Sequence, residues 1–76
     1  MNKDRRSRIA EIVSQLETLK DQIAELQGEE QDAFDNLPEG LQQSDRGQQS
    51  ENAASYLSDA ESSIDDVISS LNDAAE

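Results

Sequence analysis

Residues 9–26 read IAEIVSQLETLKDQIAEL, and this stretch decides the fold class. Steps of three and four residues place side chains on one face of an α-helix. The residues in between are mostly good helix formers, such as glutamate, glutamine, lysine and alanine. The stretch therefore predicts a long helix with a narrow apolar seam. Its large aliphatic residues follow 3-4-3-4-3 spacing: Ile9, Ile12, Leu16, Leu19, Ile23 and Leu26.

The same rhythm continues beyond this stretch to Ala33 and Leu37. Gly28 interrupts it, and a glycine inside a helix costs about 1 kcal/mol. Two interpretations stay open: one helix over about residues 3–36, softened at Gly28, or a stop at Gly28 followed by a short second helix. Pro38 ends the helix in either case, because proline lacks the N–H that a helix needs.

Residues 37–44 form the predicted turn, in which Pro38 supplies a fixed backbone angle. Ser44 is a good N-cap for a second helix over about residues 45–75, and Ser50 is a later alternative start. This helix has a smaller seam, with alanine at alternate layers. Its members are Ala53, Leu57, Ala60, Ile64, Val67, Leu71 and Ala74.

Two long helices joined by a short link form an antiparallel pair. The sequence therefore predicts an all-α, coiled-coil-like two-helix hairpin that spans residues 1–76 as a single domain. A chain of 76 residues is short for a self-sufficient core. Val13, Phe34 and Ile68 widen the apolar stripes beyond the seams, and one partner helix cannot cover them all. We therefore expect a homodimer that forms a four-helix bundle.

Charge is divided unevenly along the chain, whose formal net charge is −12. Residues 1–8 hold four basic residues against one acid, 4 − 1 = +3, and residues 9–76 hold two against 17, 2 − 17 = −15. A surface this negative repels nucleic acids and anionic membranes and attracts basic proteins. We therefore expect no direct nucleic-acid binding and no membrane binding.

The hairpin topology would place the N-terminal arginines beside the C-terminal end of the second helix. Each helix end has the wrong charge for its own dipole, so the two ends would compensate one another. Arg5, Arg6 and Arg8 could then meet four acids: Asp65, Asp66, Asp73 and Glu76.

The residue types argue against an enzyme, a metal site or a cofactor. There is no cysteine and no histidine, so thiolate and imidazole chemistry are absent. The acids of residues 29–35 do not have the spacing of a calcium-binding loop. The longest apolar run is two residues and none follows the basic N-terminus. We therefore expect neither a membrane span nor a signal peptide, and a cytoplasmic location.

The candidate partner-binding residues gather around the turn. Glu30 falls on the apolar seam, where burying a carboxylate is costly. It either pairs with a partner or with Arg46, or it lies where the seam already opens to solvent. Phe34 either completes the core or contacts a partner, since aromatic residues are enriched at binding hot spots. The full set is Glu30, Asp32, Phe34, Asp35, Glu39 and Arg46.

Residues 29–47 read EEQDAFDNLPEGLQQSDRG. This stretch resembles one in small acidic helical proteins of phages, prophages and mobile elements. The shared features are an acidic Glu-Gln entry, an Asp-Asn-x-Pro-Glu turn and a Leu/Met-Gln-x-Ser-acid-Arg exit. The resemblance covers about residues 10–72, and the turn is its specific part. That group has no established activity, so the resemblance implies a mobile-element context and no catalytic residue.

Three functional hypotheses follow. The first is a non-catalytic interaction protein that binds and modulates or inhibits a host protein, such as a basic or DNA-binding protein of a defence system. It could present a DNA-like surface, since a duplex carries one negative charge per about 1.7 Å. The second is an oligomeric bundle that binds a small nucleotide signal through Arg46 and the N-terminal arginines. The third is a structural coiled-coil component of a phage particle.

Overall fold

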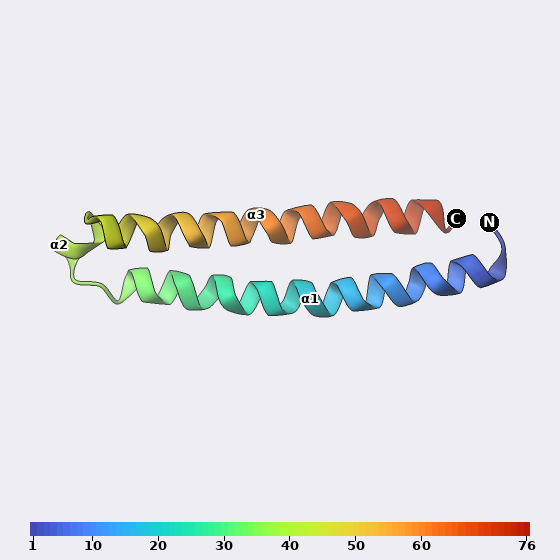
Figure 1. Ribbon diagram of the computed structural model, residues 1–76, viewed down its shortest axis with the longest axis horizontal. Coiled ribbons are helices and arrows are strands. Elements are labelled where there is room, and N and C mark those ends of the chain that lie inside the picture. The colour runs from blue at the N-terminus through green and yellow to red at the C-terminus, as the bar shows by residue number, and fades with distance from the viewer.

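The computed structural model describes residues 1–76 and contains only helices: α1 (Lys3–Asp35), α2 (Glu39–Gln42) and α3 (Asp45–Ala74). The two long helices lie side by side and antiparallel, with the chain ends together at one end and α2 at the other (Figure 1). The prediction of an all-α helical hairpin is confirmed. The molecule is a rod of 58 × 15 × 12 Å with a radius of gyration of 17.2 Å, against about 11 Å for a compact chain of this length.

Helix α1 is continuous through Gly28, so the interpretation with a stop there is wrong. A Cβ added to Gly28 would meet nothing within 4 Å. The helix begins at an N-cap, Asn2, whose side chain accepts a hydrogen bond from Arg5 N at 2.8 Å. It ends three residues before Pro38, as expected for a residue that cannot continue a helix.

The connection contains one more helical turn than the sequence predicts, because residues 39–42 form α2. The Gln42 side chain ties this turn to α1: its Nε2 donates to Phe34 O and to Leu37 O, each at 3.3 Å. Phe34 lies in the last turn of α1 and Leu37 just beyond it, where backbone acceptors lose their helical partners. Ser44 is the N-cap of α3, as predicted, and Ser50 lies inside the helix.

Gly47 and Ala54 are the two buried residues of the chain. Gly47 lies in the first turn of α3 directly against the connection. A Cβ there would come within 2.3 Å of Gln42 O and 2.7 Å of Leu41 O. Only glycine allows this approach, so Gly47 fixes how closely α3 packs against α2.

The contact between the two long helices differs from the predicted one by one row of side chains. Ile12, Leu19 and Leu26, which the heptad places in the seam, are 45%, 49% and 52% exposed. These three side chains therefore do not form the covered centre of the contact, where the heptad places them. The row one residue later takes their place. The half-buried side chains that follow this rhythm are Ile9, Val13, Leu16, Lys20, Ile23, Gln27, Glu30 and Phe34 on α1, and Leu37 just beyond its end.

Helix α3 shows the same displacement. Val67 of the predicted seam is 48% exposed, whereas Ala54 is 3% exposed. The facing row gains the residue after each of Ala53, Ala60 and Val67, while Ala53 and Ala60 themselves stay half-buried. Its members are Gly47, Ser50, Ala54, Leu57, Glu61, Ile64, Ile68 and Leu71. Small residues in this row, Gly47 and Ala54, let the helices approach closely, which is a physical reason for the displaced seam.

The charged ends meet in a different way from the prediction. Arg6 Nε donates to Ala75 O at 2.9 Å, so an arginine of α1 stabilises the C-terminal end of α3 and its dipole. The ion pairs predicted between the N-terminal arginines and the acids of α3 do not form. Arg8 pairs instead with Asp4 of its own helix, at 3.9 Å. None of the helices has the length and apolar character needed to cross a membrane.

Candidate functional site

The six candidate residues lie at the turn end of the rod, on the last two turns of α1, on α2 and at the start of α3 (Figure 1). They do not form one patch. Glu30 and Phe34 are half-buried and belong to the row that faces α3. Asp32 and Asp35 are exposed, because about 100° of rotation per residue turns them to the opposite side of α1.

The acids near the turn are available to a partner. Asp32, Asp35 and Glu39 are exposed, and none of them forms an ion pair. Asp35 Oδ1 accepts a hydrogen bond from Gln31 Nε2 at 3.1 Å, which leaves its second carboxylate oxygen free. Glu39 lies in the first turn of α2. Together they present three carboxylates that no ion pair neutralises.

Arg46 is exposed and forms no ion pair, so the pairing suggested between Glu30 and Arg46 is absent. It lies at the turn end of the rod, whereas the N-terminal arginines lie at the far end (Figure 1). A single hairpin therefore does not bring its arginines together around an anionic ligand. No group of three or more acids converges in a way that could hold a metal ion.

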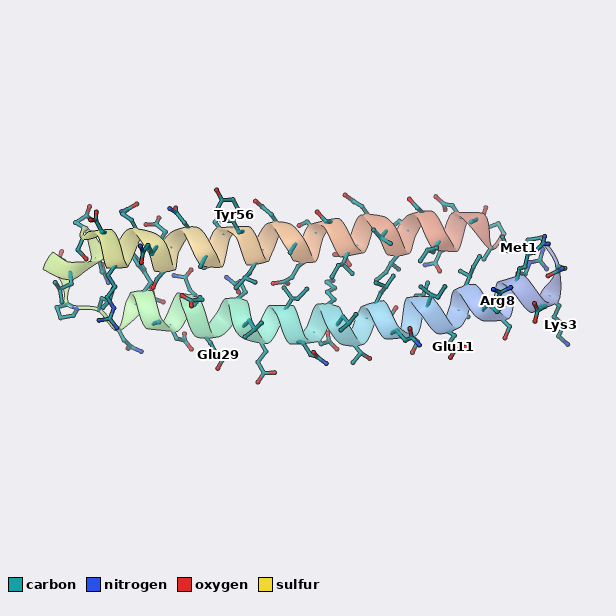
Figure 2. All side chains as sticks on the ribbon, in the orientation of Figure 1. Met1, Lys3, Arg8, Glu11, Glu29 and Tyr56 are labelled. Atoms are coloured by element: carbon teal, nitrogen blue, oxygen red, sulfur yellow. The ribbon has the colours of Figure 1, made fainter.

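A shallow groove opens on one side of the hairpin next to this end. Both long helices contribute to it, and its lining residues are Leu26, Glu29, Glu30, Ala53, Tyr56 and Leu57. Tyr56 is 74% exposed and points away from α1 (Figure 2). Four of the six lining residues are apolar, and α1 adds the carboxylates of Glu29 and Glu30.

The groove is one end of a longer apolar face. In both helices an apolar row comes one residue before the row that faces the other helix, and this row is exposed on α1 and partly exposed on α3. Because the helices are antiparallel, both rows turn to the same side of the hairpin, and the groove shared by Leu26 and Ala53 shows this directly. We call this side the apolar face. It consists of the exposed residues Ile12, Leu19, Leu26 and Ala33 on α1 and Val67 and Ala74 on α3, together with Ala53 and Ala60 of α3, which are half-buried.

The sequence identified the acids of the turn but not the apolar face. A signal for it was present, since apolar residues occupy three heptad positions on each helix instead of two. A helix with one neighbour needs a narrow stripe, whereas a bundle helix with two neighbours needs a wider one. Of the groove residues, Leu57 belongs to the predicted seam, whereas Glu29 and Tyr56 lie outside it.

Comparison with known protein families, with curated proteins and with solved structures finds no match.

Proposed function

We propose that this protein is a non-catalytic, acidic interaction protein that binds a basic surface of another protein. The observation that carries the proposal is the set of exposed carboxylates without counter-ions at the turn end: Asp32, Asp35 and Glu39. Unpaired carboxylates form charge-assisted hydrogen bonds with arginine and lysine, and a negative surface accelerates encounter with a basic partner.

The partner in this proposal is a protein of a host cell, because the turn resembles that of phage and mobile-element proteins. Binding would modulate or inhibit the host protein in the host cytoplasm. A basic or DNA-binding partner fits best, since exposed acids occur along most of the length of a 58 Å rod. A DNA-binding surface would meet carboxylates where it otherwise meets phosphates.

The proposed assembly is a homodimer in which two hairpins form a four-helix bundle. Two buried residues out of 76 are few for an independent domain. Most side chains at the helix contact are only half-buried, and a second hairpin would complete their burial. The carboxylates of the turn stay on the outside of such a bundle, because Asp32 and Asp35 lie away from α3.

A pull-down from nuclease-treated host lysate tests this function. The tagged full chain is incubated at low and at moderate salt, and bound proteins are identified by mass spectrometry. We expect one host protein in a fixed ratio to the bait, with a basic surface, retained at low salt and released at moderate salt. If the chain elutes alone at both salt concentrations, the proposal of a protein partner is overturned.

A further inference from the structure

We infer that the apolar face is the interface with a second copy of this chain, and that the two hairpins stack with their turns at opposite ends. The inference rests on the proposed homodimer and adds the face and the orientation. In this arrangement a two-fold axis passes beside Leu19, the middle residue of α1 (Lys3–Asp35), and each long helix packs antiparallel to its own copy.

The exposed area is large enough for this interface. The chain exposes 5571 Å², whereas a compact protein of the same mass exposes about 4,600 Å². The excess of about 1,000 Å² is close to the roughly 800 Å² that each partner buries in a standard interface. The apolar face extends over most of the length of both helices and contains side chains that are about half exposed, such as Ile12, Leu19 and Val67.

The rows on the face complement themselves under this symmetry. With Leu19 on the axis, Ile12 of one copy lies level with Leu26 of the other, since both are seven residues from the centre. The α3 rows match in the same way, with Ala60 level with Val67 and Ala53 level with Ala74. Large residues meet across the α1 pair and small ones across the α3 pair, so both pairs can pack in layers.

Charge selects the orientation of the two copies. A second groove at the N-terminal end of α1 is lined by Met1, Arg5, Arg8, Ile9 and Ile12, and the groove at the turn end carries Glu29 and Glu30. Turns at opposite ends bring Arg8 of one copy level with Glu30 of the other. Turns at the same end would instead gather the acids of both copies, which costs energy through like-charge repulsion.

Cysteine cross-linking tests the face and the orientation together. The chain has no cysteine, so Leu19→Cys introduces one thiol beside the axis. Under mild oxidation we expect a disulfide-linked dimer, because the two Cα atoms would lie within about 7 Å. Glu17→Cys is the control: it is exposed on the opposite side of α1 and should stay unlinked.

A charge exchange provides a second measurement. Arg8→Glu and Glu30→Arg should each raise the dissociation constant of the dimer about tenfold. Each variant disrupts two symmetry-related contacts between Arg8 and Glu30, and each contact contributes a factor of a few. The double variant should restore the dissociation constant of the unmodified chain. Circular dichroism of each variant verifies that the hairpin still folds.

The outcomes separate the proposals. A native mass of one chain, 8.4 kDa, at micromolar concentration overturns the dimer and this inference. If the mass is that of a dimer but Leu19→Cys does not cross-link, the proposed face is overturned and the dimer stands. If Leu19→Cys cross-links only when it is mixed with Val67→Cys, the proposed orientation is overturned and the dimer stands. Neither measurement involves a host protein, so a failure of partner binding is detected separately.

Discussion

Lys20 Nζ lies 2.7 Å from Asp65 Oδ1, in the one ion pair that joins α1 to α3. The lysine side chain is 33% exposed and the aspartate 55% exposed, so water screens the pair only in part. The hydrogen bond to Asp65 raises the pKa of Lys20 above its ordinary value of 10.5, although partial burial acts in the opposite direction. The negative charges of Asp65, Glu61 and Asp21 raise the pKa further.

This pair should make stability depend on alkaline pH. Because the pKa of Lys20 is raised in the folded state, its stabilising contribution is fully present below pH 10.5 and is lost as pH rises through the folded value. Lys20→Met should therefore melt at a lower temperature than the unmodified chain near neutral pH. The difference should shrink once Lys20 deprotonates. Thermal melts of both proteins across this range measure it, and a constant difference would contradict the assignment.

The two glycines of the long helices should respond to alanine in opposite directions. Gly47→Ala forces a Cβ within 2.3 Å of Gln42 O, so it should destabilise the hairpin by about 1–3 kcal/mol. Gly28→Ala has free space around the new methyl group and should stabilise α1 by about 1 kcal/mol. Urea unfolding monitored by circular dichroism gives both values. A neutral effect of Gly47→Ala would show that α2 does not pack against α3.

The Gln42 side chain should hold the connection in place. Gln42→Ala removes donors to Phe34 O and Leu37 O and should cost about 1 kcal/mol. Gln43→Ala is a matched control, since Gln43 is exposed and its side chain makes no hydrogen bond. Hydrogen exchange of the amides around α2 should accelerate in the first variant and stay unchanged in the second. Equal exchange in both would exclude a role for Gln42.

The sequence predicts the helices and the turn well because their signals are local. Pro38 can end a helix, Ser44 can cap one, and the heptads extend over many turns. The choice between two neighbouring apolar rows is not local. By hydrophobicity and spacing, Leu19 is a better seam residue than Lys20. The structure nevertheless places Lys20 at the helix contact, beside Asp65.

The close approach at Gly47 was equally hidden, because it depends on where the carbonyls of α2 lie. For the candidate site, the acids around the turn could be chosen from charge alone. The heptad also separates Glu30, on the seam, from Asp32 and Asp35, which lie off it. The half-buried position of Phe34 follows from the displaced seam, so the sequence could not supply it.

The most direct test of the proposed function compares partner capture by three proteins of defined charge. The turn variant combines Asp32→Asn, Asp35→Asn and Glu39→Gln. The control variant combines Glu11→Gln, Glu17→Gln and Asp73→Asn, which neutralises three exposed acids far from the turn. We predict that the control captures the same host protein as the unmodified chain and that the turn variant loses it. Equal capture by all three proteins would contradict a binding surface at the turn, and equal loss in both variants would show that only total charge matters.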